Sequence, residues 1–192
     1  MRVSRRSLLH LGSGVGTSVV ALGMTGPTLA APAIVGLRKL DTRALSFDCC
    51  NTGERLNKVT YWAEGKYCPD ALAEINYALR DFQTGDVFPI EPTLLDVLNQ
   101  IGRRLGTDCH FELYSGYRSA KTNAILHRLD PQVATHSLHM KGQAVDISLP
   151  GRSLRKVCDA ALAMRMGGVG YYPDSEFLHV DVGRVRQWTG LG

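Results

Sequence analysis

The sequence lacks several features that would place it in a special class of protein. Its five cysteines include no Cys-x-x-Cys pair, which argues against a zinc–thiolate site. After residue 30, no apolar run reaches the ~20 residues that a membrane span needs. There is no internal repeat, and charged residues make up 21% of the chain against 44% hydrophobic residues. This mixture is typical of a globular domain with a real core, and 192 residues suit one such domain.

The first thirty residues differ from the rest of the chain. They contain no Asp or Glu, begin with arginines that include the Arg5-Arg6 pair, continue through a weakly apolar segment broken by glycines, and end in small residues near Ala30. This order is typical of an export signal, and the arginine pair resembles the twin-arginine type. An ordinary secretory signal and a retained anchor are the alternatives. We expect a twin-arginine signal at 1–30, a mature domain at 31–192 in the periplasm or elsewhere outside the cytoplasm, and membrane contact only during export.

Export changes the charge balance of the chain. Removing the signal takes away three arginines and leaves 19 basic against 18 acidic residues, a net charge of about +1. The pI of 8.9 therefore describes the precursor and gives no support to nucleic-acid binding. All five cysteines remain after processing, and an odd number leaves at least one thiol without a partner in the chain. We expect a monomer.

Hydrophobic periodicity predicts helices early in the mature chain and strands mainly late. Helices are expected at 69–83, 92–105, 120–129 and 153–166, and strands at 44–47, 58–62, 109–113, 144–149, 169–172 and 177–182. The segment 131–142 has no clear period and is expected to be a loop. This order predicts an α+β domain in which helices pack on an antiparallel sheet.

The strongest chemical pattern is Ser137-Leu138-His139-Met140-Lys141-Gly142-Gln143-Ala144-Val145-Asp146. An imidazole and a carboxylate seven residues apart, separated by a glycine turn, can reach one metal ion from a loop and from the strand that follows it. On that strand Asp146 lies on the opposite face from Val145 and Ile147, which predicts a polar cleft face and an apolar core face. The alternative is a structural Asp146 that accepts hydrogen bonds from the backbone, with His139 as an unrelated loop residue.

A second pattern, Glu176-Phe177-Leu178-His179-Val180-Asp181, lies near the C-terminus. Alone, His179 would be interpreted as a hydrogen-bonded core residue. Together with His139 and Asp146 it completes two imidazoles and one carboxylate, the ligand set of a catalytic zinc ion with one open position. Such ligands make magnesium or calcium poor choices. Asp181 shares the strand face of His179 and is expected to orient its ring.

Two further residues near this set have competing interpretations. Glu176 is expected to act as the general base and then the general acid of a hydrolytic reaction, although a solvated loop carboxylate would look the same. His136 lies three residues before His139 and is an alternative metal ligand.

The pattern Ser-x-His-x-x-Gly-x-Ala-x-Asp followed by Glu-x-x-His closely resembles the zinc D-alanyl-D-alanine carboxypeptidase and dipeptidase family, which shares a fold with the hedgehog signalling domain. The segment Ser115-Gly116-Tyr117-Arg118-Ser119 looks like the family's substrate-binding segment, in which the arginine contacts a carboxylate or nearby peptide oxygens. The resemblance covers about residues 85–190. It implies one zinc ion per chain, held in a cleft on one sheet face, with Arg118 and Tyr117 beside the substrate.

The size, the signal and the Gly-Val-Gly-Tyr-Tyr-Pro segment at 168–173 look most like the exported murein endopeptidase branch of that family. The resemblance implies hydrolysis of peptide bonds in peptidoglycan stem peptides, by opening cross-links. A D,D- or L,D-carboxypeptidase that trims these peptides is one alternative, because both reactions can use the same ligands. A metal-containing wall-binding module without catalysis is another, and the presence of Glu176 favours the enzyme.

Replacing Arg5 and Arg6 with lysines tests the export route. A twin-arginine signal requires the arginine pair, so we expect the double-lysine precursor to remain in the cytoplasm at its full mass, measured by cell fractionation and mass spectrometry. An Arg2→Lys change, outside the pair, is the matched control and should leave export intact. Normal export of the double variant would assign the chain to the ordinary secretory route.

Overall fold

The structure is a computed structural model that describes residues 41–190. The predicted signal at 1–30 lies outside the described residues. None of the helices within 41–190 has the length and hydrophobicity to cross a membrane. In chain order the elements are β1 Arg43–Cys49, β2 Arg55–Ala63, β3 Lys66–Tyr67, α1 Pro69–Ala78, α2 Pro92–Arg104, β4 His110–Ser115, α3 Ala120–Leu129, the 3-10 helix η1 Leu138–Lys141, β5 Ala144–Ser148, α4 Leu154–Met164, β6 Gly168–Tyr172, β7 Phe177–Asp181 and β8 Arg186–Thr189.

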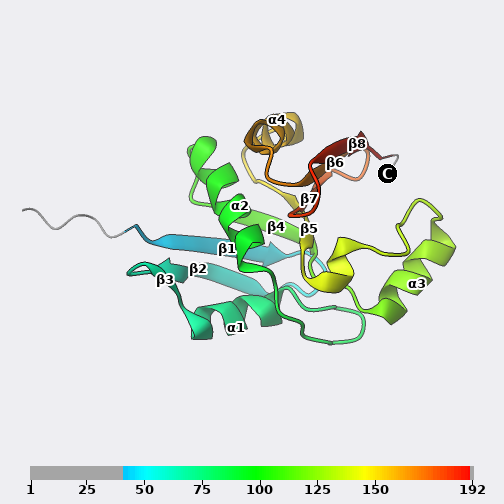
Figure 1. The fold of residues 1–192 in the computed structure, drawn as a ribbon, viewed down its shortest axis with the longest axis horizontal. Coiled ribbons are helices and arrows are strands. Elements are labelled where there is room, and N and C mark those ends of the chain that lie inside the picture. Colours follow the sequence, from blue (N-terminus) through cyan, green and yellow to red (C-terminus); the bar gives the residue numbers. More distant parts are fainter. Residues whose placement is uncertain (1–40, 191–192) are drawn as a thin grey trace, which may run out of the picture. The chain divides into compact units, whose positions relative to one another are not determined.

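One eight-stranded sheet runs through the described residues in the order β3-β2-β1-β4-β5-β7-β6-β8 (Figure 1). Five of its neighbouring pairs are antiparallel, and two, β1–β4 and β6–β8, are parallel. The α+β class is confirmed, and the sheet, predicted to be antiparallel, is mixed. Parallel neighbours require a long crossover, and the chain between β1 and β4 supplies one because it contains β2, β3, α1 and α2.

Alternation along the central strands separates the core from the polar face of the sheet. Val145 and Ile147 of β5 and Leu178 of β7 are fully buried in the hydrophobic core. α2 contacts β1, α4 contacts β6 and β7, and the two helices contact each other. Helices therefore cover the apolar face of the central strands, and Asp146 and His179 project from the other face, as the alternation predicts.

The helix α2 follows the sequence prediction closely. It begins at Pro92, whose fixed φ suits the first helical position, and ends one residue before the predicted Leu105. Its apolar stripe is confirmed, because Leu94, Leu98 and Ile101 have no exposed surface. Burial of each such side chain stabilises the fold by about 1.5–3 kcal/mol.

Other elements differ from the prediction. The helix α1 ends at Ala78, several residues before the predicted stop at Thr84-Gly85-Asp86, and Phe82 is 45% exposed instead of lying in the buried stripe. The predicted loop 131–142 contains η1, and β3 and β8 are too short to leave a periodic pattern. Ser153 stands at the N-cap of α4, as predicted, but its side chain makes no capping bond.

The early end of α1 is explained by Asp81, a carboxylate that is only 2% exposed. Its Oδ1 accepts hydrogen bonds from the backbone N–H of Gln83 and of Thr84, at 2.9 and 3.3 Å. Its Oδ2 accepts one from the backbone N–H of Ser119 at 2.8 Å. Burial alone would raise the pKa of Asp81, but hydrogen bonds from Thr122, Ser119 and Gln83 outweigh it and lower the pKa to about 2. Asp81 thus joins the loop after α1 to the segment that begins α3.

Replacing Asp81 with Asn should destabilise the fold in a pH-dependent way. The folded pKa of about 2 lies below the usual 3.8, so ionisation contributes about 2 kcal/mol of stability at neutral pH. Because the folded pKa is the lower one, this contribution is complete above about pH 5 and is lost as the pH falls from about 4 towards 2. Urea unfolding should show the full difference from wild type at pH 7 and roughly half of it at pH 3. The exposed Asp108→Asn is the control, and an equal loss at both pH values would contradict the assignment.

Candidate metal centre

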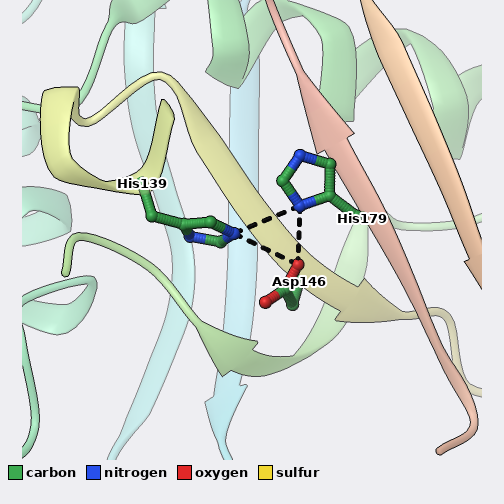
Figure 2. A group of neighbouring side chains, drawn as sticks. All are labelled: His139, Asp146 and His179. Atoms are coloured by element: carbon green, nitrogen blue, oxygen red, sulfur yellow. Dashed lines mark hydrogen bonds and ion pairs between the residues drawn. The ribbon is translucent and has the colours of Figure 1, made fainter. Parts of the chain in front are cut away.

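Two of the three predicted metal ligands lie on paired strands. Asp146 in β5 is directly opposite His179 in β7, and His139 comes from η1, just before β5. Figure 2 shows the three side chains turned towards one another from these elements. Gly142 ends η1 at a φ of 63°, which glycine adopts without strain, and a Cβ at this position would collide with the carbonyl oxygen of Pro89. The turn predicted at Gly142 is confirmed.

The three facing atoms form a small triangle. His139 Nε2 lies 3.1 Å from His179 Nδ1 and 3.3 Å from Asp146 Oδ1, and Nδ1 and Oδ1 are 2.9 Å apart. A tetrahedral zinc ion with ligand bonds of roughly 2.0–2.1 Å holds its ligand atoms about 3.3 Å apart. The triangle therefore has the dimensions to surround one such ion. All three residues are at most 9% exposed.

Hydrogen bonds on the far side of each ring determine which nitrogen carries a proton. His139 Nδ1 lies 2.7 Å from the carbonyl oxygen of Gly116, which can only accept, so Nδ1 donates and Nε2 presents a lone pair. His179 Nε2 lies 3.1 Å from Asp181 Oδ2, so by the same reasoning His179 Nδ1 presents a lone pair. When both rings are neutral, three electron-pair donors therefore face one another, an arrangement that suits a metal cation between them. The donor set fits zinc.

Burial and neighbouring charged groups shift the pKa of each of these residues in opposite directions. Burial lowers the pKa of His139 despite the attraction of Asp146. For Asp146, burial acts to raise the pKa, but the two imidazoles outweigh it and the pKa lies far below its usual value. For His179, burial acts to lower the pKa, and hydrogen bonds to Asp146 and Asp181 outweigh it and raise the pKa. Without a metal, a proton would be held between His179 and Asp146, so metal binding displaces that proton.

Asp181 contacts the ring of His179, as the sequence predicts for an orienting residue. Its side chain has no exposed surface. Oδ1 accepts hydrogen bonds from the backbone N–H of Gly168 at 2.9 Å and of Gly183 at 2.8 Å. Arg186 binds both carboxylate oxygens, at 2.7 and 3.1 Å. Burial alone would raise the pKa of Asp181, but these partners and His179 lower it, so the residue is an anion at neutral pH.

The predicted substrate-binding residues lie in different surroundings. Arg118 lines the same cavity as the three candidate ligands, and its Nη2 lies 3.4 Å from Asp146 Oδ2 and 3.2 Å from Ser115 Oγ. Tyr117 points elsewhere: its ring stacks on Phe88 at 4.8 Å between centroids, and it does not line the cavity. Of this pair, the structure brings only Arg118 to the cleft.

The candidate ligands lie at a cleft with a volume of about 470 Å³. One wall consists of aromatic side chains from β6, β7 and β8, and the other is the segment 130–138, which includes His136. The lining residues are Arg118, Asp130, Gln132, Val133, Ala134, His136, Ser137, Leu138, His139, Asp146, Tyr172, Ser175, Phe177, His179, Arg186 and Trp188. A peptide can therefore approach the triangle from the polar face of the sheet.

Comparison with known proteins places this chain in a family. The family model for Peptidase_M15_2, described as peptidoglycan L,D-endopeptidase MepK, matches residues 38–188. The chain is 39% identical over 189 residues to the probable peptidoglycan L,D-endopeptidase MepK of Haemophilus influenzae, covering 98% of this chain and 97% of that protein. It is 40% identical over 185 residues to the peptidoglycan L,D-endopeptidase MepK of Escherichia coli K12, covering 96% and 97%. The chain belongs to this family.

Family membership confirms the resemblance to zinc D-alanyl-D-alanine peptidases and to their murein endopeptidase branch. No solved structure matches the chain significantly. The family assignment therefore rests on the sequence, and the arrangement of the site rests on the geometry given above.

Glu176, like Tyr117, is a predicted site residue that the structure does not bring to the cleft. It lies on the exposed turn before β7 with a φ of 57°, and it lines a neighbouring cavity with Glu112, Tyr114 and Ser148. The spacing explains this position. Side chains alternate along β7, so Phe177 and His179 face the cleft and a residue three before His179 does not.

Sequence analysis missed Arg186, which lies in β8 and lines the cleft. β8 has four residues and pairs with β6 in parallel, so neither its pattern nor its position in the chain indicated that it borders the centre. The one signal in the sequence for a contact with Asp181 was that Arg186, five positions later, is basic.

Metal analysis distinguishes His139, which lies in η1, from His136, which lies in the loop before η1. His139→Ala removes one of three ligands, so we expect purified variant protein to lose its zinc, measured by elemental analysis after refolding with zinc. His136→Ala is the matched control and should retain one ion per chain, because His136 is not part of the triangle. A wild-type protein that stays metal-free in the same procedure would contradict the site.

Proposed function

We propose that the chain is an exported zinc peptidase that hydrolyses peptide bonds in peptidoglycan, acting as an endopeptidase on cross-linked stem peptides. One observation carries the proposal: three buried electron-pair donors converge at a cleft in a chain that belongs to the MepK family along nearly its whole length. These relatives are named as peptidoglycan L,D-endopeptidases, which favours an endopeptidase over a carboxypeptidase. The twin-arginine route and a monomeric state remain predictions.

In this proposal His139, Asp146 and His179 hold one zinc ion per chain. Zinc bound by three such ligands retains one open position, polarises a carbonyl group and lowers the pKa of water. Gly116 and Asp181 fix the ring orientations that present the two nitrogen lone pairs.

Arg118 suits the task of binding the substrate beside this centre. Its side chain is 12% exposed and borders the cleft. Both of its side-chain contacts within residues 41–190 use Nη2, so Nε and Nη1 remain for a carboxylate or a peptide oxygen of the substrate. The contact to Asp146 also means that Arg118 supports a ligand, so a test of substrate binding has to preserve the positive charge.

Proton transfer has two candidate carriers. Glu176 is the predicted base, and its carboxylate would reach the cleft only if the turn before β7 changed conformation. The left-handed backbone of Glu176 costs about 1–2 kcal/mol, and a change to a right-handed conformation would release this strain. His136 already lines the cleft, and an imidazole can accept a proton and return it. This position favours His136 as the second candidate.

Purified cross-linked muropeptides test the proposed function. Wild-type protein with zinc should cleave them, with products identified by mass spectrometry. Trimming of a terminal residue alone would favour the carboxypeptidase, and zinc binding without any cleavage would favour the wall-binding module.

Paired variants assign the proton carrier. Glu176→Gln keeps the shape of the side chain but removes its basic oxygen, so we expect zinc content near wild type and kcat lower by at least ~10². His136→Gln is measured in parallel and should keep most of its activity. Full activity of Glu176→Gln with a large loss in His136→Gln would transfer the role to His136. Arg118→Lys, which keeps the charge but not the planar fork, should mainly raise KM.

A further inference from the structure

Arg186 stands behind one of the two imidazoles of the centre. It extends from β8 to Asp181 and binds both carboxylate oxygens, with Nη2 2.7 Å from Oδ2 and Nη1 3.1 Å from Oδ1. Oδ2 is also the atom that faces His179 Nε2 at 3.1 Å. A guanidinium, a carboxylate and an imidazole thus form a continuous chain from the edge strand to the candidate metal ligand.

The two carboxylate oxygens of Asp181 have different hydrogen-bond partners. Oδ1 receives two backbone N–H groups, from Gly168 and Gly183. Within residues 41–190, Oδ2 receives only side chains, Arg186 and His179. The backbone therefore fixes where the carboxylate sits, and Arg186 fixes how it is rotated. That rotation aims Oδ2 at the ring of His179.

The surroundings of Arg186 are built to keep its guanidinium in place. It lies over the ring of Trp188 at 4.9 Å, and Nη1 also donates to the carbonyl oxygen of Arg184 at 3.1 Å. A Cβ at position 168 would collide with the Arg186 guanidinium and with Asp181 Oδ2, so glycine at this position leaves the room that the ion pair occupies. The contact is therefore part of the packing of β6 against β8.

The second imidazole does not depend on a side chain in this way. His139 Nδ1 donates to the carbonyl oxygen of Gly116, a backbone group. In the part of the chain that the structure describes, the second ring nitrogen of His179 contacts a side chain, whereas that of His139 contacts the backbone. The structure assigns Arg186 as a positioning residue that sets the zinc affinity of the centre by holding Asp181 against His179. This inference rests on the proposed function only in taking zinc as the resident metal.

Zinc affinity of the purified full chain, measured by competition with a chelating dye, tests the inference. Partners that orient metal ligands typically contribute 10–100-fold to affinity. We expect Arg186→Gln to raise the zinc Kd about 10-fold or more. Arg186→Lys keeps the cation but cannot bind both oxygens, so its Kd should rise less, about 3–10-fold. The exposed neighbour Arg184→Gln is the matched control and should leave the Kd unchanged.

Two further readouts separate positioning from a purely structural role. Urea unfolding of the metal-free proteins measures how much stability each variant loses. A purely structural role would lower the stability without changing the zinc Kd. The visible spectrum of cobalt(II)-loaded protein reports the ligand geometry, and we expect it to change in Arg186→Gln but not in Arg184→Gln. If Arg186→Gln fails to fold, the Kd of Arg186→Lys decides.

A zinc Kd of Arg186→Gln within about twofold of the wild-type value would overturn the inference. If that variant does not fold, the same result for Arg186→Lys would overturn it. The outcome is independent of muropeptide cleavage. A wild type that binds zinc but cleaves nothing would remove the proposed function and leave this inference intact.

Discussion

The centre depends on one electrostatic constraint: three electron-pair donors converge in a buried site, and their close approach is stabilised by a cation, either a metal ion or the proton that His179 and Asp146 share without one. His139 Nε2, Asp146 Oδ1 and His179 Nδ1 lie 2.9–3.3 Å apart. Their mutual repulsion would separate them unless a cation lay between them. The acceptors behind the rings, Gly116 and Asp181, prevent either ring from escaping by changing its tautomer. The same contacts direct the two ring nitrogens at the place where a metal ion would bind.

The fold connects this centre to distant parts of the chain through one short segment. Gly116 offers its carbonyl to His139, and Arg118 contacts Asp146 and donates its backbone N–H to the carbonyl of His139 at 3.2 Å. The same segment is held from outside, because Tyr117 donates its backbone N–H to Leu79 and Ser119 donates to Asp81. A Cβ at Gly116 would collide with the Leu79 carbonyl, so this close approach requires glycine. The loop after α1 thus supports the segment that contacts two of the candidate metal ligands.

The sequence predicted the parts of the structure that local pattern determines. The strand alternation around Asp146 and His179, the turn at Gly142 and the bounds of α3 all follow from neighbours in the chain. The parts it missed depend on distant pairing. The end of α1 is decided by a carboxylate that binds Ser119, far along the chain, and the parallel pairing of β8 with β6 brings Arg186 to the centre. The position of Glu176 differs from the predicted one for a third reason. The spacing Glu-x-x-His does not determine towards which face of the sheet the side chain of a turn residue points.

The charges around the cleft favour a reaction in which negative charge develops on the substrate. Asp146 and Asp181 each carry a negative charge, and each is paired with an arginine, Arg118 and Arg186 respectively. These four charges cancel, and both imidazoles are neutral when they donate lone pairs to a metal. A divalent ion would therefore keep its full charge in a buried, weakly screened position. Such a field favours binding of a carboxylate-bearing peptide and stabilises the negative charge that develops on a carbonyl oxygen under attack. Because each carboxylate is paired with its own arginine, these side chains leave the charge of a bound ion uncompensated.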